Sequence, residues 1–233
     1  MTELEQLKRE ITDKGLKEIL RWVLEKFGPE KVVLASSFSL EDQVITHALV
    51  KINPKARIFT LDTGRLFQET YEVMQKTMDR YRIHYEVLFP ATKEVEALVS
   101  ETGPNSMYNS LSLRLKCCEI RKVKPLRRIL ATADAWICGL RREQGITRQE
   151  VEVIDWDKQF NIYKISPLAA WSEEELWRYI KDNAVPYNTL YDKGFRSIGC
   201  APCTRPTKPE EDLRAGRWWW ENPEHRECGL HKR

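Results

Sequence analysis

The sequence predicts an α/β protein whose doubly wound, mostly parallel sheet carries helices on both faces. Short β-branched or apolar runs alternate with helical segments of about 10–15 residues, which is the pattern of βαβ units. The chain has 233 residues, 42% of them hydrophobic and 31% charged, enough to bury a large core without disulfides. Its longest apolar runs, such as residues 32–35, are far shorter than the ~20 residues of a membrane span.

The predicted elements follow one another along the chain. Residues 4–27 repeat apolar side chains at helical spacing with an interruption near Gly15, and predict one or two helices that end at Gly28-Pro29. The expected strands are residues 31–35, 57–61, 84–89, 135–140 and 162–165. The expected later helices are residues 40–50, 67–81, 92–100, the segment on either side of Cys117-Cys118, and 173–181, the last with a capping box from Ser172 and Glu175.

The composition changes after about Thr204, beyond which few strongly apolar residues stand among prolines and mixed charges. Such a segment cannot form its own core. We therefore expect a main α/β domain over residues 1–204 and a mobile C-terminal tail over residues 205–233 that docks on it. Residues 218–220, three consecutive tryptophans, form either an apolar latch for this tail or an edge of the core.

Charge and cysteine content restrict the class of protein. Lys and Arg number 38 against 35 Asp and Glu, and a net charge of +3 predicts neither a nucleic-acid nor a membrane surface. The first ten residues lack the apolar run of a secretory signal. Six cysteines in such a chain indicate metal binding or thiol chemistry. We expect a cytoplasmic, soluble enzyme.

A serine-rich turn, with Ser36, Ser37 and Ser39, follows the first expected strand and precedes a helix. Backbone N–H groups at a helix N-terminus, beside hydroxyls, can cradle a phosphate-like anion at the carboxyl edge of the sheet. The loop lacks the Walker A and dinucleotide glycine patterns, so a simple Ser-capped helix is an equal alternative. Residues 61–65 end the second strand and bring a hydroxyl, a glycine turn and a guanidinium to the same edge.

Four cysteines form two pairs, the tandem Cys117-Cys118 and the C-x-x-C of Cys200 and Cys203. Four thiolates can ligate zinc or the irons of a cubane cluster, while a C-x-x-C alone also suits a redox dithiol. Adjacent side chains diverge along the backbone, which favours the larger cluster. Two basic residues that follow the tandem pair by three and four positions could offset its charge.

The last two cysteines differ in their surroundings. Cys138 lies in an apolar strand and is interpreted as a small buried hydrophobe. Cys228 lies in the tail among basic residues, which favour the thiolate, and a near-terminal thiol can enter a site and then meet a second protein. The sequence therefore predicts Cys228 as a nucleophile.

Together these motifs resemble the assimilatory sulfonucleotide reductases, and among them the adenylyl-sulfate reductases that carry an iron–sulfur cluster. The family is also similar to the ATP pyrophosphatases, with an adenine nucleotide alpha hydrolase-like fold. The matching stretches are residues 36–42, 61–65, 117–122, 139–144, 200–203, 216–221 and 227–231.

The resemblance implies a reaction and a cofactor. Cys228 would attack the sulfate sulfur of adenosine 5′-phosphosulfate (APS), releasing AMP, and thioredoxin or glutaredoxin would resolve the S-sulfocysteine to give sulfite for cysteine biosynthesis. The implied cofactor is a 4Fe–4S cluster, structural and electrostatic in role, on Cys117, Cys118, Cys200 and Cys203. Sulfate and phosphate oxygens suit bidentate guanidinium groups. The residues expected to bind substrate are Ser36, Ser37, Ser39, Thr63, Gly64, Arg65, Lys122, Arg141, Arg214, Arg217 and His231.

Alternatives to this function stay open. The enzyme could reduce 3′-phosphoadenylyl sulfate (PAPS), or both sulfonucleotides. More distant alternatives are an adenylating ATP pyrophosphatase and a zinc-stabilised binding module. The sequence does not decide between thioredoxin and glutaredoxin as the reductant. It also leaves the oligomeric state open, and a homo-oligomer is one of the alternatives.

Overall fold

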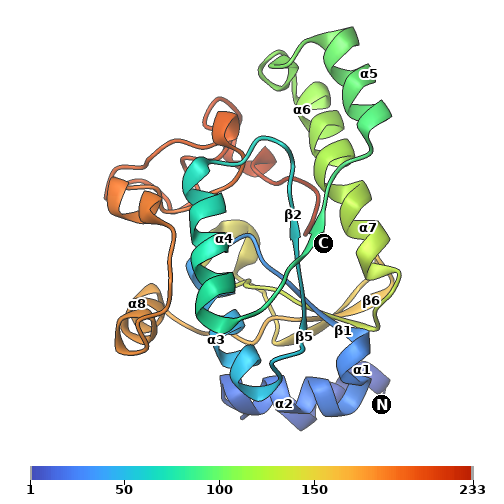
Figure 1. Ribbon diagram of the computed structural model, residues 1–233, viewed down its shortest axis with the longest axis vertical. Coiled ribbons are helices and arrows are strands. Elements are labelled where there is room, and N and C mark those ends of the chain that lie inside the picture. Colours follow the sequence, from blue (N-terminus) through green and yellow to red (C-terminus); the bar gives the residue numbers. More distant parts are fainter. Residues whose placement is uncertain (1, 232–233) are drawn as a thin grey trace.

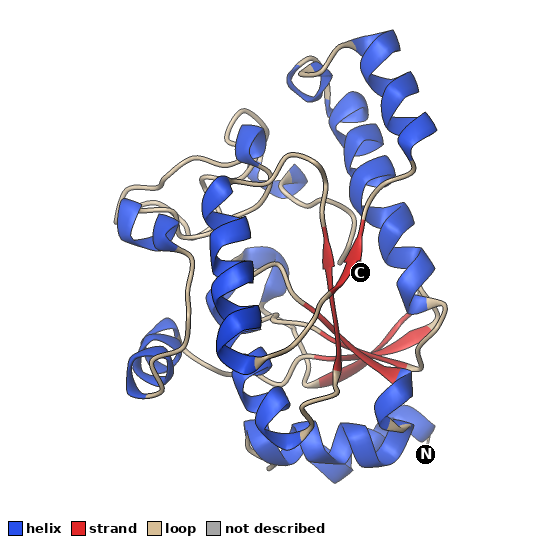
Figure 2. Cartoon of the chain, in the orientation of Figure 1, coloured by secondary structure: helices blue, strands red, loops and turns tan. Residues whose placement is uncertain are grey.

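A six-stranded sheet with helices on both faces forms the centre of the protein, whose computed structural model describes residues 2–231 (Figure 1, Figure 2). The strand order is β3-β2-β1-β4-β6-β5, and every pair is parallel except the antiparallel β5–β6. The strands are β1 (Val32–Ala35), β2 (Arg57–Leu61), β3 (Glu86–Leu88), β4 (Ala135–Ile137), β5 (Ile154–Asp157) and β6 (Ile162–Ile165). The predicted fold class is confirmed.

Helices cover both faces of the sheet. Successive side chains of each strand point to opposite faces, so each face has apolar side chains for helices to pack on. Val32 and Leu34 join a core with α1, α2, α3 and α8, whereas Val33 faces the opposite core with α7. The helices are α1 (Glu3–Ile11), α2 (Leu16–Phe27), α3 (Leu40–Ile52), α4 (Gln68–Tyr81), α5 (Thr92–Thr102), α6 (Leu111–Cys118), α7 (Lys124–Leu130) and α8 (Glu173–Asp182). No helix within residues 2–231 is both long and apolar enough to cross a membrane.

Most boundaries match the prediction, and the differences have local causes. The N-terminal segment forms two helices because Gly15 adopts an extended conformation at the N-cap of α2. Ser172 and Glu175 form the predicted capping box of α8. The strand expected at residues 135–140 ends at Ile137, because the backbone beyond it turns into the loop that reaches Arg141. Strand β5 was not predicted.

The helix that carries the tandem cysteines is continuous but changes its winding. Residues Glu119–Val123 form a π-helical turn between α6 and α7. Such a turn inserts an extra residue into the helix and is common at functional sites. It places Arg121 and Lys122, together with Cys117 and Cys118, around one pocket.

The order of the strands reverses between β1 and β4. Ligands of open α/β sheets bind beyond the carboxyl ends of the strands at such a switch point. The loops that follow β1 and β4 meet there. Gly139, which follows β4, lies so close to Glu41 and Asp42 that a Cβ added to it would come within 2.7 Å of both residues. Only glycine fits this approach.

Residues beyond Thr204 pack against the rest of the protein. Thr204 and Arg217 form an antiparallel bridge, and Trp218, 1% exposed, joins an apolar cluster with Cys118, Cys203 and Cys228. Trp218 is therefore core, while Trp219 is 38% exposed. The domain boundary at residue 204 remains a prediction.

Candidate active site

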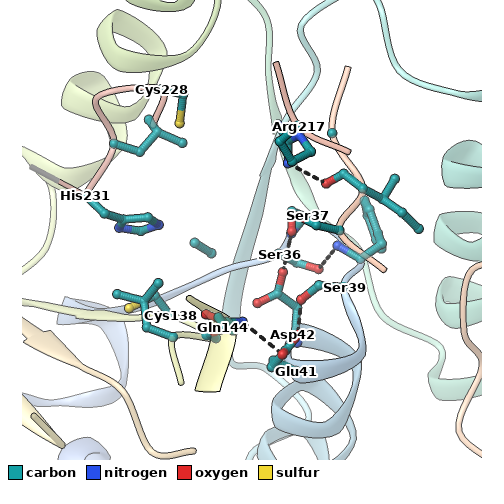
Figure 3. Close-up of a pocket in the computed structure, with 18 of the residues that line it drawn as sticks. Ser36, Ser37, Ser39, Glu41, Asp42, Cys138, Gln144, Arg217, Cys228 and His231 are labelled. Carbon is teal, nitrogen blue, oxygen red and sulfur yellow. Dashed lines mark hydrogen bonds between the residues drawn. The ribbon is translucent and has the colours of Figure 1, made fainter. Parts of the chain in front are cut away.

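A large pocket opens at the switch point of the sheet (Figure 3). Its empty volume, including the open mouth, is about 1470 Å³, large enough for a nucleotide. Residues from the ends of β1, β2 and β4 form one wall, and tail residues, including Arg217, Cys228 and His231, form the other. The residues predicted at the sheet edge and in the tail thus meet in one cavity, except Gly64 and Arg65.

The serine loop is held by its own hydrogen bonds. The Ser39 hydroxyl accepts a hydrogen bond from the Asp42 N–H (3.2 Å) and caps α3, while the Ser37 N–H and hydroxyl both donate to Asp42 Oδ2 (2.7 and 2.8 Å). Phe38 adopts a left-handed conformation at φ 62°, which turns the chain between strand and helix. Burial raises the pKa of Asp42 to about 6, against the lowering effect of the Ser37 bonds. All three serines line the pocket, but Ser37 already has a carboxylate partner.

Arg141 also lines this wall and forms a buried ion pair with Glu41. Its Nε donates to Glu41 Oε1 at 2.8 Å, and the two side chains are 3% and 7% exposed. A second nitrogen donates to the Trp171 carbonyl (2.9 Å), and the Gln144 amide donates to the same Glu41 oxygen (2.8 Å). Much of the hydrogen-bonding capacity of Arg141 is therefore used within the protein.

The tail wall carries an excess of positive charge. Arg214 and Arg217 of the tail line the pocket there, beside Arg148 and Lys122 of the main domain. Glu227 is the carboxylate that pairs with Arg148 and Arg214. Glu227 lies 3.3 Å from a nitrogen of Arg148 and 3.3 Å from one of Arg214. Burial raises the pKa of Glu227, but these arginines lower it overall. Burial and the nearby Arg148 lower the pKa of Arg214.

Arg217 is fixed by its surroundings, at 6% exposure. Its guanidinium lies 4.6 Å from the Trp218 ring and donates to the Ile198 carbonyl at 3.2 Å. It packs on the backbone at Gly199, where a Cβ would lie only 2.2 Å from a guanidinium nitrogen. A glycine is required there for the arginine to reach its place.

Cys228 and His231 face the serine loop across the cavity (Figure 3). Cys228 is 8% exposed and lies in the tail segment that Gln159 holds through the Gly229 carbonyl (3.1 Å). The His231 ring stacks on Trp136 of β4 with centroids 5.2 Å apart, and burial lowers its pKa well below the usual value. A neutral imidazole is therefore present in the closed tail.

A second, smaller pocket gathers the four paired cysteines. Cys117, Cys118, Cys200 and Cys203 all line it, with Arg65, Arg121 and Lys122 among their neighbours. All four are free thiols, and each interacts electrostatically with at least one other member of the set. Thr63 Oγ1 lies 3.2 Å from Cys200 Sγ.

The chemistry of this donor set fits a cationic core. Burial raises the pKa of Cys117, of Cys118 to about 12 and of Cys203 to about 11, because it removes the water that would solvate the thiolates. For Cys200, burial also raises the pKa, but Lys122 and the Thr63 hydroxyl lower it overall. Coordination to metal would supply positive charge and deprotonate the thiols. Among residues 2–231, no group of three or more Cys, His, Asp or Glu side chains is arranged to hold a single metal ion.

Two predicted substrate-binding residues lie away from the nucleotide pocket. The Arg65 guanidinium donates to the Pro104 carbonyl and to Asn105 Oδ1 (2.8 Å) and lines the thiol pocket. Gly64, at φ 72°, forms a turn in which its N–H donates to Asp62 (2.8 Å). Neither residue lines the nucleotide pocket, and their contact with substrate remains a prediction.

Comparison with known proteins is consistent with this geometry. Residues 31–206 match the phosphoadenosine phosphosulfate reductase domain. An adenosine 5′-phosphosulfate reductase of Allochromatium vinosum is 47% identical over 204 residues, covering 88% of this chain and 80% of the relative. The chain belongs to the APS/PAPS reductase family. A second relative, the adenosine 5′-phosphosulfate reductase of Pseudomonas aeruginosa, is 42% identical over 236 residues and matches 98% of this chain and 86% of its own.

Solved structures of other proteins have folds similar to that of this reductase. The phosphoadenylyl-sulfate reductase of Candida auris superposes with a TM-score of 0.73 at 26% identity, covering 86% of this chain and 96% of that one. An FMN adenylyltransferase of Candida glabrata, 16% identical with a TM-score of 0.58, covers 88% of this chain and 71% of its own and shares only the fold.

Several pocket residues of the reductase were not predicted from its sequence. Arg148 lies in a short turn that no sequence periodicity predicts. It is held at the site because it donates to the Gln144 side chain (2.5 Å) and pairs with Glu227. Glu227 directly precedes Cys228, and its position in a basic tail was the available signal. Cys138 is buried as expected, yet it also lines the pocket near its floor (Figure 3).

Proposed function

We propose that this reductase converts APS to sulfite and AMP with Cys228 as its nucleophile. The observation that carries the proposal is the position of Cys228 in the wall of the switch-point pocket, beside Lys122, Arg214 and Arg217. This pocket offers the edge of the sheet to the nucleoside of a dianionic nucleotide. It offers more cations than carboxylates to the acidic groups of that nucleotide. The relatives named adenosine 5′-phosphosulfate reductase, at 42–47% identity, support the same substrate.

The reaction balances as three successive displacements at sulfur. The Cys228 thiolate attacks the sulfate sulfur, an S–S bond forms, and the bond to the bridging oxygen breaks so that AMP leaves with the electron pair. A dithiol protein then attacks Cys228 Sγ and releases sulfite. Its second thiol closes a disulfide and regenerates the Cys228 thiol, so the dithiol supplies both electrons.

The cations of the tail wall supply electrostatic stabilisation. Negative charge shifts to the bridging oxygen as AMP leaves, and preorganised cations in an enclosed site stabilise such charge more strongly than water does. Arg214 and Arg217 are expected to hold phosphate or sulfate oxygens, since guanidinium forks match them. Lys122 lies between the two pockets and lines both.

We further propose a 4Fe–4S cluster on Cys117, Cys118, Cys200 and Cys203. When bound, it would supply a fixed charge distribution next to Lys122 and hold the segment of Cys200 and Cys203 against α6. It need not exchange electrons, because the dithiol provides both. Metal analysis of anaerobically purified protein should find about four irons and labile sulfide per chain; one zinc without sulfide would favour the zinc-stabilised module.

A thiol substitution tests the central claim. Cys228→Ser should abolish sulfite release from APS with thioredoxin, and no label from ³⁵S-labelled APS should remain on the C-terminal peptide. Cys138→Ser is the matched control, since it alters a buried thiol of the same pocket and should keep the label on Cys228. Turnover retained by Cys228→Ser would refute the mechanism.

Substrate choice is tested by parallel turnover of the two sulfonucleotides. All four cluster cysteines are present, and the relatives reported above at 42–47% identity are named APS reductases, so we expect kcat/KM for APS to exceed that for PAPS at least roughly tenfold, about 1.4 kcal/mol. Equal values would indicate a dual-substrate enzyme. Pyrophosphate release from ATP would support the ATP pyrophosphatase alternative.

Thioredoxin or glutaredoxin as the reductant, and the cytoplasm as the compartment, belong to the same proposal. Six free cysteines suit a reducing compartment. Steady-state rates with either reductant, and the mass of the native protein in solution, would fix the partner and the oligomeric state.

A further inference from the structure

Arg114 is a buried cation that donates four hydrogen bonds to the tail. It is 1% exposed on α6, outside the nucleotide pocket. Its Nε and one terminal nitrogen form a bidentate pair with Glu221 (2.9 and 2.6 Å), whose side chain is 8% exposed. The guanidinium also donates to the carbonyls of His225 and Glu227, each at 2.6 Å, and lies 4.8 Å from the Trp218 ring. A desolvated guanidinium with this many partners fixes the segment that it holds.

The two ends of this contact are the thiol pocket and the nucleophile. Arg114 precedes Cys117 and Cys118 by three and four residues, which places all three on one face of α6. It lines the thiol pocket together with both cysteines. At the other end, the Glu227 carbonyl that it binds belongs to the residue before Cys228.

The tail is held differently from the side of the sheet. There Gln159 donates to the Gly229 carbonyl, Trp136 stacks on His231, and Arg148 pairs with Glu227. Trp136 and Arg148 line the nucleotide pocket, and all three hold the tail from the sheet side. Arg114 holds the tail from the side of the thiols. The hydrogen bonds that it donates to the carbonyls of residues 225 and 227 determine where the tail backbone enters the site.

We propose that Arg114 is a positioning residue that holds Cys228 in the nucleotide pocket by binding Glu221 and the backbone carbonyls ahead of the nucleophile. The inference rests on the proposed function for its catalytic consequence. The fork geometry is essential, since a lysine at this position has the charge but cannot serve a carboxylate and two carbonyls together.

The first test measures closure of the tail without turnover. In substrate-free, cluster-loaded protein, the alkylation rate of Cys228 by iodoacetamide is followed by mass spectrometry of the C-terminal peptide. Arg114→Lys should raise this rate roughly tenfold or more, as expected for loss of charge-assisted hydrogen bonds. Arg127→Lys on α7, an exposed arginine paired with Glu119, should leave it unchanged. Equal alkylation rates in Arg114→Lys and the wild type would refute the proposal, and this readout stands even if Cys228 proves not to be the nucleophile.

A second variant separates positioning from simple stabilisation. Arg114→Met/Glu221→Met replaces the buried ion pair with apolar side chains, which commonly restores or increases stability. It cannot restore the carbonyl bonds to residues 225 and 227. We expect a wild-type unfolding midpoint and iron content, but fast alkylation of Cys228 and a kcat at least tenfold reduced with a KM for APS within about twofold of the wild type. Recovery of slow alkylation and of kcat together with stability would show that Arg114 serves the fold alone, and would refute the proposal.

Discussion

The two walls of the nucleotide pocket differ in how their charges are balanced. On the sheet wall, Asp42 accepts the Ser37 hydrogen bonds and Glu41 neutralises Arg141, so the polar groups are paired within the protein. On the tail wall, Lys122, Arg148, Arg214 and Arg217 are concentrated around Glu227. A self-paired wall suits a neutral nucleoside, and a wall with excess positive charge suits its acidic groups.

This contrast assigns different roles to arginines that look alike in sequence. Arg141 and Arg214 were both expected to bind substrate, but the first is committed to a carboxylate and the second shares one with Arg148. Substitutions on the sheet wall should therefore change stability more than affinity, and those on the tail wall should do the opposite.

Arg141→Met is expected to have the largest effect, on stability. It leaves Glu41 buried without its cation, and breaking a buried ion pair in this way costs about 3–5 kcal/mol. Urea unfolding should show the loss as a lower midpoint at unchanged slope. Arg142→Met is the control, because Arg142 is exposed and donates to the Val151 carbonyl.

The double variant Glu41→Gln/Arg141→Met sharpens this prediction. It removes the unpaired charge and should recover part of the stability. If Arg141→Met instead unfolds like the wild type and raises KM for APS, Arg141 is a substrate ligand and the contrast between the two walls fails.

Lys122→Met should give the next largest effect, on catalysis. The lysine lines both pockets; burial lowers its pKa, but the Cys200 and Cys228 thiols raise it overall, so it stays charged. Removing one preorganised charge from an enzyme site typically costs about 10²–10³ in rate. We expect a loss of that order in kcat/KM for APS, measured by sulfite release. Lys124→Met, two residues along and paired with Glu94 at the surface, should retain the wild-type value within about twofold.

Local patterns predicted the sheet wall, because its elements are set by nearby residues. Strand β2 (Arg57–Leu61) has the predicted boundaries, and Ser39 caps α3 as any serine before a helix can. Strand β5 (Ile154–Asp157) alternates apolar and acidic side chains as a strand does, but the alternation is too short to be recognised without its pairing with β6. Its four residues carry no periodicity long enough to distinguish it from a loop.

The tail wall was predicted through family motifs, since its contacts join distant residues. Arg114 and Glu221 are 107 positions apart, and nothing near either residue in sequence indicates the other. Arg217 was expected, but its dependence on Gly199 appears only when the two backbones meet. The sequence can indicate that a charged residue belongs to a site. Whether that residue binds substrate or stabilises the fold depends on its partner, and the partner is known only from the three-dimensional structure.

Arg214→Gln should have a moderate effect that falls on affinity. The guanidinium lies in the tail wall, donates to the Arg226 carbonyl (3.0 Å) and shares Glu227 with Arg148. Loss of one charge-assisted contact to substrate should raise KM for APS roughly tenfold, about 1.4 kcal/mol. Unfolding should change little. Arg205→Gln, in the same tail but paired with Glu211 away from the pocket, serves as the control. A stability loss equal to that of Arg141→Met would place Arg214 with the scaffold.

Asp42→Asn should give the smallest effect, a change in the pH dependence of stability. Burial raises the pKa of Asp42 from 3.8 to about 6, so between these values the folded protein binds more protons at this site than the unfolded chain. The contribution of this carboxyl to the free energy of unfolding therefore falls as pH rises through that window, by about 1.4 kcal/mol between pH 5 and 7.5. Asparagine retains an oxygen for the Ser37 N–H and does not titrate. The stability of Asp42→Asn relative to the wild type should thus increase by about 1.4 kcal/mol from pH 5 to 7.5 in urea unfolding, because the other titrating groups cancel in the difference. A relative stability that stays constant or falls over this range would mean that Asp42 is ionised throughout, and that the sheet wall is stabilised by its negative charge.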